Sequence, residues 1–190
     1  MRRPIILALA LLGLGGCSAA TRPPITTVAS VDLERFMGDW YVIANIPTFL
    51  EKDAHNAVES YRLAPDGTIE TTFTFRAGGF DGPRKQYRPR GFVFDRESNA
   101  VWGMQFVWPI KADFRIVYLT PDYQQTVIGR QARDHVWIMA RTPSIPDDDY
   151  ARILDYLARQ GYEVARIQRV PQDWRGLDPP REAPAAVRGS

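Results

Sequence analysis

The central part of the chain alternates between hydrophobic and polar residues in short runs that are separated by turn-forming residues. This period of two is typical of β-strands with one buried face, and several such runs in succession indicate a barrel or a sandwich. Pro65-Asp66-Gly67 and Arg133-Asp134 favour tight turns between neighbouring runs. The pattern predicts strands near residues 39–47, 56–64, 68–76, 85–95, 100–108, 113–120, 124–131 and 135–142.

The hydrophobic period changes after the last of these runs. Residues 147–160 predict a helix with one apolar face, because apolar residues recur at the spacing i, i+3, i+4 and i+7: Tyr150, Ile153, Leu154 and Leu157. The aspartates at 147–149 suit the first turn of this helix, whose dipole they complement, better than a metal site. Gly161 suits its end, and the renewed alternation over 162–170 predicts a ninth strand outside the barrel.

The inward side chains decide whether the barrel interior is a packed core or a ligand-binding cavity, since a barrel of eight strands can have either. Alternation places an aromatic and methionine-rich set inside, which favours a wall for an acyl chain over a densely filled core. The predicted ligand-binding residues are Tyr61, Phe73, Trp102, Met104, Phe106, Phe114, Ile116, Tyr118, Trp137 and Met139, with Phe75 and Trp108 on the same faces. A plain packed core remains the alternative. In the fourth strand, either Phe92 and Phe94 or Gly91 and Val93 face inward.

Few polar residues are candidates for holding the head group of such a ligand. Tyr118 could do so by a hydrogen bond, and Arg76, Arg88 and Arg90 could do so by charge near the mouth. Glu59 alternates with inward positions, but an unpaired buried carboxylate is costly. We therefore expect Glu59 at an exposed position at the mouth.

The first residues of the chain have the pattern of a targeting segment. Two arginines precede the apolar run 5–14, which is too short to span a membrane. Leu14-Gly15-Gly16-Cys17 resembles the bacterial lipobox, which implies cleavage before Cys17 and acylation of that residue. Ser18 after the cysteine implies sorting to the outer membrane. An ordinary secretory signal is the alternative. We expect a signal peptide at 1–16, an acylated flexible tether at 17–30, a folded domain at 31–174 and a disordered tail at 175–190.

Charge and cysteine content restrict the possible partners and the stabilising bonds. The chain has 24 Lys and Arg against 22 Asp and Glu, and cleavage after residue 16 removes Arg2 and Arg3, which leaves 22 against 22. A balanced charge gives no reason to expect nucleic acid as a partner. A lone, acylated cysteine leaves no disulfide, so burial alone must stabilise the fold. Exposed aromatic residues such as Phe80 and Tyr87 are candidates for a homodimer contact.

Three local motifs resemble those of the lipocalin family: Gly38-Asp39-Trp40 in the first strand, Thr120-Pro121-Asp122-Tyr123 after the sixth, and Arg141 at the end of the eighth. The longer runs at 31–41 and 137–143 together resemble the bacterial lipocalins in particular. The resemblance covers residues 31–174 and implies an all-β, eight-stranded antiparallel up-and-down barrel with one C-terminal helix packed outside. It implies structural roles for Gly38, Trp40, Asp122 and Arg141, with Arg141 over the Trp40 indole at a closed end. It also implies an open mouth and a fatty acid, lysophospholipid or similar ligand for a periplasm-facing protein of the outer membrane. Pro121 departs from the family pattern and puts the geometry of its loop in doubt.

An enzyme has little support in the sequence. The chain has no Gly-x-Ser-x-Gly motif, and His55 and His135 lack the spacing of metal ligands. We expect no catalytic residue, metal or cofactor. Two rival functions stay open. A lipid-modifying enzyme would need a polar dyad inside the barrel, such as Glu59 with Tyr61 or His55, and a ligand-free structural protein of the envelope would have a filled interior.

Overall fold

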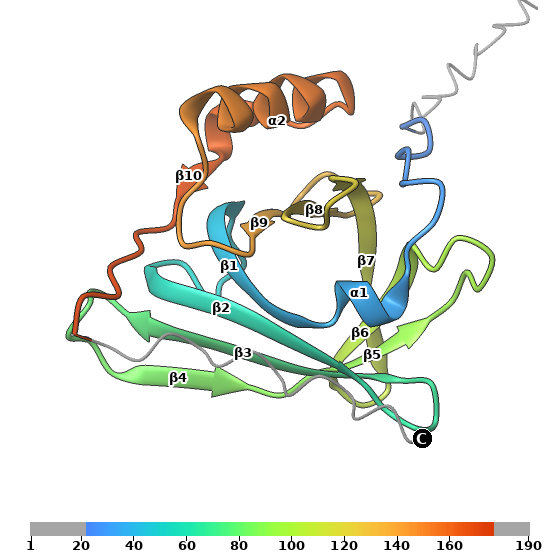
Figure 1. Ribbon diagram of the computed structural model, residues 1–190, viewed down its shortest axis with the longest axis horizontal. Helices are drawn as coiled ribbons and strands as arrows, with labels where there is room; N and C mark the ends of the chain where they lie inside the picture. The colour runs from blue at the N-terminus through green and yellow to red at the C-terminus, as the bar shows by residue number, and fades with distance from the viewer. Residues whose placement is uncertain (1–21, 177–190) are drawn as a thin grey trace, which may run out of the picture.

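The strands of the described region, residues 22–176, form an antiparallel sheet that closes on itself in the computed structural model (Figure 1). Consecutive strands pair along the chain, except that the fourth and fifth strands both pair with the third, and the last barrel strand pairs with the first. The strands are β1 (Gly38–Ile46), β2 (Ala54–Leu63), β3 (Ile69–Ala77), β4 (Arg84–Tyr87), β5 (Arg90–Val93), β6 (Val101–Val107), β7 (Ile110–Leu119), β8 (Gln125–Gly129) and β9 (Val136–Ala140).

β4 and β5 together occupy one position of the barrel, because both pair with β3. Pro89 lies between them and has no backbone N–H to donate to a ladder, which accounts for the interruption. The described residues therefore form the closed eight-stranded antiparallel barrel that the sequence predicts. The observed strands lie within a few residues of the predicted ones.

Two hydrophobic clusters occupy opposite sides of this sheet. The interior cluster fills the barrel from inward residues such as Trp40, Tyr61 and Trp102. The outer cluster packs β1, β7, β8 and β9 against helix α2 (Asp147–Arg159), whose Ile153 and Leu157 are fully buried. Figure 1 shows α2 lying across the outside of the barrel, as the apolar stripe predicts. Gly161 follows the helix with φ of +87°, a conformation that glycine adopts without steric cost.

β-bulges in two strands change which residues face inward. The register of β1 against β9 shifts between Val42 and Ala44, and that of β7 against β8 shifts between Ile116 and Tyr118. A bulge adds one residue on one strand and so reverses the alternation beyond it. Simple alternation therefore fails in the second half of β1 and at the end of β7.

The end of the barrel where β1 begins, hereafter the closed end, is covered by the short helix α1 (Leu33–Phe36). The Arg141 guanidinium lies 3.7 Å from the ring centroid of Trp40, as the resemblance implied. Arg141 also donates to the carbonyl oxygens of Met37, Asp39 and Phe36 at 2.8, 2.9 and 3.1 Å. Gly38 has φ of +95°, and a Cβ there would approach Nη1 of Arg141 to 3.2 Å, so glycine suits this position.

The turn at 120–123 lies at this same end. Its Asp122 accepts a hydrogen bond from the backbone N–H of Gln124 at 3.2 Å, and hydrogen bonds lower the pKa of its carboxyl. Tyr123 takes φ of +61°, so the chain accommodates Pro121 by a left-handed residue two positions later.

Two segments outside the barrel and one residue of β4 correct three expectations. Only Gln168–Arg169 (β10) forms a strand within the predicted ninth strand, where a 3₁₀ turn at Val164–Arg166 breaks the alternation. The described part of the predicted tether, 22–30, packs on the barrel, because Ile25 is 4% exposed and the N–H of Val28 donates to Ile116 O at 3.0 Å. Tyr87 is not an exposed dimer contact, since its ring stacks on Phe75. Cys17, the signal segment 1–16 and the tail beyond 176 lie outside the described residues.

Candidate functional site

The structure brings most of the predicted ligand-binding residues together in the interior cluster: Tyr61, Phe73, Trp102, Met104, Phe114, Ile116 and Met139, with Trp137 packed against them. Phe75, Ile128 and Val42 join the same cluster. The fourth strand turns Val93 inward, whereas Phe94 faces out and is 57% exposed. This settles the alternative that the sequence left open in favour of Gly91 and Val93.

The closed half of the barrel is filled with aromatic rings. Trp102 stacks on Phe114 with ring centroids 5.0 Å apart, and Phe36 contacts both Trp40 and Trp102 at 5.1 and 5.6 Å. Both indoles are 0% exposed. Interiors at this density leave no room for a ligand chain. Any ligand must therefore lie in the other half, towards the end where β1 finishes and β2 begins, hereafter the mouth.

Two predicted wall residues lie elsewhere. Tyr118 faces outward, because the bulge after Ile116 reverses the alternation, and its ring lies 5.6 Å from that of Tyr156 on α2. Phe106 is 48% exposed beyond the register shift that follows Met104, and Trp108 in the next turn is 83% exposed. The predicted wall residues Tyr118 and Phe106 therefore do not belong to the interior cluster, and neither does Trp108.

Glu59 lies inside the barrel, which corrects the expectation of an exposed position. Its strand neighbours Ala57 and Tyr61 and its lateral partners Trp40 and Phe73 all belong to the interior cluster. Tyr61 donates a hydrogen bond from its hydroxyl to the Glu59 carboxylate. Burial raises the pKa of Glu59 to about 7, an effect that the Tyr61 hydrogen bond opposes. The alternation along β2 indicated an inward position for Glu59. The expected cost of burying a carboxylate led to the wrong prediction of an exposed position.

Glu51 is a second interior acid, and it comes from the loop between β1 and β2. It is 3% exposed and accepts hydrogen bonds from the Trp137 indole N–H at 3.0 and 3.1 Å and from the Thr48 N–H at 3.1 Å. Burial raises the pKa of its carboxyl. A loop residue has no periodicity, so no sequence signal could have placed Glu51 against an inward tryptophan.

Asn45 is a third polar residue that the sequence analysis missed. Simple alternation from Trp40 and Val42 turns Asn45 outward, but the bulge in β1 pairs it with the inward Trp137. Asn45 is 1% exposed, and its Oδ1 has no hydrogen-bond partner among the described residues. The interior near the mouth thus contains several buried acceptors.

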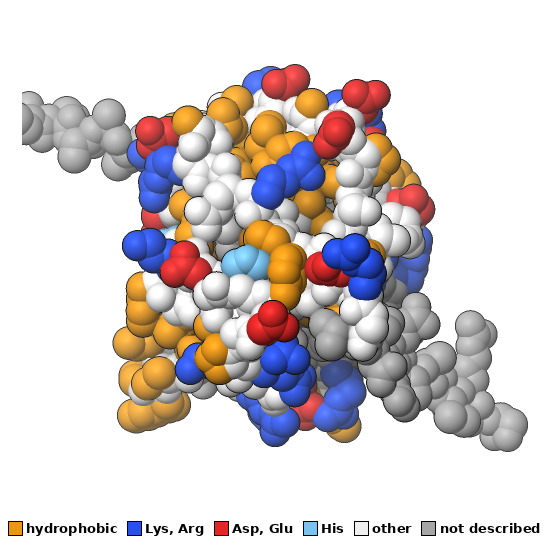
Figure 2. All heavy atoms as spheres, turned by 90° about the vertical axis from the view of Figure 1, so that its left-hand side faces the viewer, with side chains coloured by type: hydrophobic (Ala, Val, Ile, Leu, Met, Phe, Trp, Pro, Cys, Tyr) orange, Lys and Arg blue, Asp and Glu red, His pale blue; other side chains and the backbone are white. Residues whose placement is uncertain are grey.

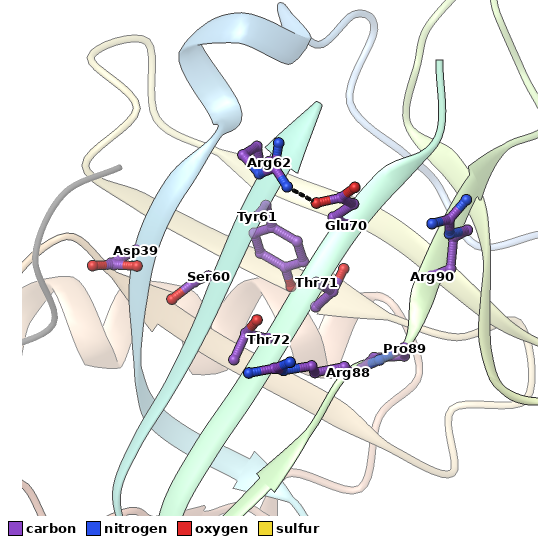
Figure 3. A pocket seen from close by; sticks show the side chains of 10 residues that line it. All are labelled: Asp39, Ser60, Tyr61, Arg62, Glu70, Thr71, Thr72, Arg88, Pro89 and Arg90. Carbon is purple, nitrogen blue, oxygen red and sulfur yellow. Dashed lines mark hydrogen bonds and ion pairs between the residues drawn. The ribbon is translucent and has the colours of Figure 1, made fainter. Parts of the chain in front are cut away.

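The arginines predicted for a head group lie outside the barrel. Arg76 is paired with His55 on the outer face and donates to Gly82 O at 3.2 Å. Arg88 and Arg90 line a polar hollow of about 560 Å³ across the outer side of β2 and β3, where the structure pairs Arg62 with Glu70 (Figure 3). Both acidic and basic side chains line this hollow, so its surface does not carry charge of one sign.

Exposed hydrophobic side chains gather around the turn between β6 and β7. Val107, Trp108 and Ile110 are 68%, 83% and 69% exposed. Figure 2 shows the side of the molecule on which β3 ends and β4 begins, and hydrophobic side chains form a patch at its lower left. Within residues 22–176, no helix is long and apolar enough to cross a membrane, and no cluster of metal-ligating side chains is found.

Comparison with known proteins agrees with this architecture. The family model described as "Lipocalin-like domain" matches residues 31–172. The chain is 29% identical to temperature-induced lipocalin-1 of Arabidopsis thaliana over 175 residues, covering 86% of this chain and 89% of the relative. It is 26% identical to outer membrane lipoprotein Blc of Escherichia coli K12 over 160 residues, covering 82% and 88%. Insecticyanin from the tobacco hornworm Manduca sexta has a similar fold, with a TM-score of 0.65 at 12% identity, covering 86% and 94% of the two chains.

Proposed function

Because this chain belongs to the lipocalin family, we propose that it binds and carries a hydrophobic ligand in the mouth half of its barrel. One observation carries the proposal. Phe73, Phe75 and Met104 form an apolar inward wall, while Trp137 and Glu59, which also face inward, are only partly buried. An inward side chain with accessible surface borders open space, and apolar space of this kind suits an acyl chain.

The ligand that we propose is a fatty acid, a lysophospholipid or a similar single-chain lipid. Support comes from the aromatic and methionine side chains of the wall, which adapt to flexible chains. The filled closed half limits the length of chain that can enter, because Trp102 and Phe114 stack across it. A ligand would therefore extend from the mouth with part of its length near the rim.

We propose that the protein is attached to the outer membrane through acylated Cys17 and faces the periplasm. The lipobox-like run before Cys17 supports this, as does the relative from Escherichia coli, which is by name an outer membrane lipoprotein. Several acyl chains on one residue would hold the protein durably, because each buried methylene contributes about 0.8 kcal/mol. We further propose a homodimer through the exposed turn between β6 and β7.

The buried Glu59–Tyr61 dyad keeps a lipid-modifying enzyme as a second candidate function. A carboxyl with a pKa of about 7 is suited to proton transfer near neutral pH. Incubation with a lysophospholipid followed by mass spectrometry separates the two functions. Recovery of unchanged lipid supports a carrier, whereas hydrolysis that Glu59→Gln abolishes supports an enzyme.

The carrier function is tested by titrating the chain from Ser18 onward, which keeps every described residue and both hydrophobic clusters. Oleate and a lysophospholipid are added to delipidated protein while tryptophan fluorescence is followed, and we expect saturable one-to-one binding. Phe75→Asp should weaken binding by at least about tenfold, whereas Thr74→Asp, on the outer face of the same strand, should not. Absence of binding to the delipidated wild-type protein would overturn the carrier function.

A further inference from the structure

We propose that the barrel selects ligands whose buried polar group is a hydrogen-bond donor, above all a primary ammonium, over ligands that carry a carboxylate. The inference rests on the proposed carrier function and narrows its ligand, because among the single-chain lipids proposed above it places those with an ammonium head group before fatty acids. Three polar side chains in the interior, Glu51, Glu59 and Asn45, carry it together. Their shared property is that each presents acceptor atoms.

The two carboxyls lie on elements that meet at the mouth half. Glu59 points inward from β2, between the interior residues Ala57 and Tyr61. Glu51 reaches the interior from the loop that follows β1 and holds the indole N–H of Trp137 on β9. The charge of Glu51 raises the pKa of Glu59, so the two groups interact. A carboxylate head group placed beside them would add a further like charge in a poorly solvated site.

Asn45 is an independent observation that points to a ligand. Its side chain is inward, 1% exposed and without a hydrogen-bond partner at Oδ1 among the described residues. A buried acceptor that stays unpaired destabilises the folded protein. A donor on the ligand would relieve this cost, whereas a second acceptor would not.

Two of the interior donors are already used, whereas the inward Thr71 hydroxyl has no hydrogen-bond partner among the described residues. The Tyr61 hydroxyl donates to Glu59, and the Trp137 indole donates to Glu51. Within the described residues, the buried polar side chains that face the interior, such as Asn45, Glu51 and Thr71, include no cation. Lys85, which pairs with the inward Phe75 at the end of β3, is exposed at the rim. Arg141, at the closed end, is engaged with backbone carbonyls and the Trp40 ring. An entering ammonium brings three donors and a positive charge, and it can therefore neutralise the two interior carboxyls while it donates to Asn45.

The test compares three ligands that share one dodecyl chain: dodecylamine, dodecanol and dodecanoate. Each displaces a neutral fluorescent probe from the chain that begins at Ser18, at pH 7.4 and below micelle formation. We expect the amine to bind at least about tenfold more tightly than the carboxylate, with the alcohol between them. Glu59→Gln should remove most of the advantage of the amine over the alcohol. The control Glu70→Gln, which alters an exposed carboxylate on the outer face of β3, should change nothing.

The outcomes separate this inference from the carrier function. Dodecanoate binding as tightly as dodecylamine to the wild-type protein would overturn the selectivity and leave the carrier function standing. If the Glu59→Gln variant has a normal unfolding transition and still prefers the amine, Glu59 does not cause the preference. Failure of all three ligands to displace the probe would count against the carrier function itself.

Discussion

Glu59 links the interior of the barrel to the stability of the fold. Its pKa rises from 4.5 to about 7 on folding. Below pH 4.5 the carboxyl is protonated in both states, and the full stability is present. Between pH 4.5 and about 7 the unfolded chain releases the proton while the folded chain retains it, so the free energy of unfolding should fall by about 3 kcal/mol. Glu51, whose pKa is also raised, acts in the same direction.

Urea unfolding at pH 5 and pH 7.5 measures this loss. Glu59→Gln should make the stability less dependent on pH over that interval, because an amide does not titrate. Asp173, with its pKa lowered to about 2, titrates below the interval and leaves the comparison unaffected. Identical pH slopes for the wild-type protein and Glu59→Gln would contradict the assignment of the shift to Glu59.

Arg141 is a structural residue whose planar group cannot be replaced by another cation. Its guanidinium donates at once to Met37 O, Phe36 O and Asp39 O and covers the Trp40 ring. Lysine offers a compact ammonium that cannot span these acceptors. We expect Arg141→Lys to lower the free energy of unfolding by about 2 kcal/mol, measured by urea titration. Arg152→Lys, which changes an exposed helix pair, should stay within about 0.5 kcal/mol; equal losses for both variants would refute the role.

At the scale of elements, the C-terminal segment holds two barrel strands together. β1 pairs with β2 only as far as Tyr41, and β10 then pairs with Ala44 and Asn45. Beyond β10, the Gln172 amide donates to Val42 O at 2.8 Å and to Ala57 O at 3.1 Å. The segment therefore bridges the place where β1 and β2 separate.

Gln172→Ala removes this bridge and should cost about 1–2 kcal/mol of stability. The effect should be local as well, since the Asn56 N–H donates to Pro171 O at 2.9 Å in the same segment and should exchange faster with solvent. Gln168→Ala is the matched control, because its amide makes an exposed contact with Lys52 O at 3.3 Å. Unchanged hydrogen exchange at Asn56 in Gln172→Ala would argue against the bridge.

The elements themselves were predictable because periodicity and turn chemistry are local. The strands, the helix at 147–159 and the interior position of Trp102 and Phe114 follow from alternation alone. Tyr118 and Asn45 were placed wrongly or missed because a bulge depends on the partner strand and leaves no period in the sequence. Glu51 comes from a loop, and only the folded chain brings it to Trp137. The polar part of the candidate site was thus the part least accessible to sequence reasoning.

At the scale of the molecule, the two ends of the barrel have different chemistry. The closed end is sealed by α1, by stacked aromatic rings and by Arg141 over Trp40. The mouth half contains the interior acids Glu51 and Glu59 beside the apolar wall, and Glu59 and Trp137 there are only partly buried. Because the two ends differ in this way, a ligand can enter the barrel only from the mouth. This difference also separates residues that stabilise the fold from residues that are free to determine ligand preference.

The turn between β6 and β7 carries three of the four most exposed large hydrophobic side chains among the described residues. Val107, Trp108 and Ile110 expose most of their surface side by side along the chain, and contiguous apolar patches of this kind mark association sites. If a second copy covers this turn, Trp108→Ser should weaken self-association by about tenfold or more, because aromatic anchors dominate such contacts. Sedimentation velocity over a range of concentrations measures the effect in the chain from Ser18.

Phe49→Ser is the matched control for this experiment, since Phe49 is 89% exposed but lies in the separate loop between β1 and β2. It should leave the dimerisation constant unchanged. A wild-type protein that sediments as a monomer at every concentration would refute the homodimer. The exposed turn would then be available to another apolar surface, and binding of the wild-type protein, but not Trp108→Ser, to phospholipid vesicles would identify that surface as a bilayer.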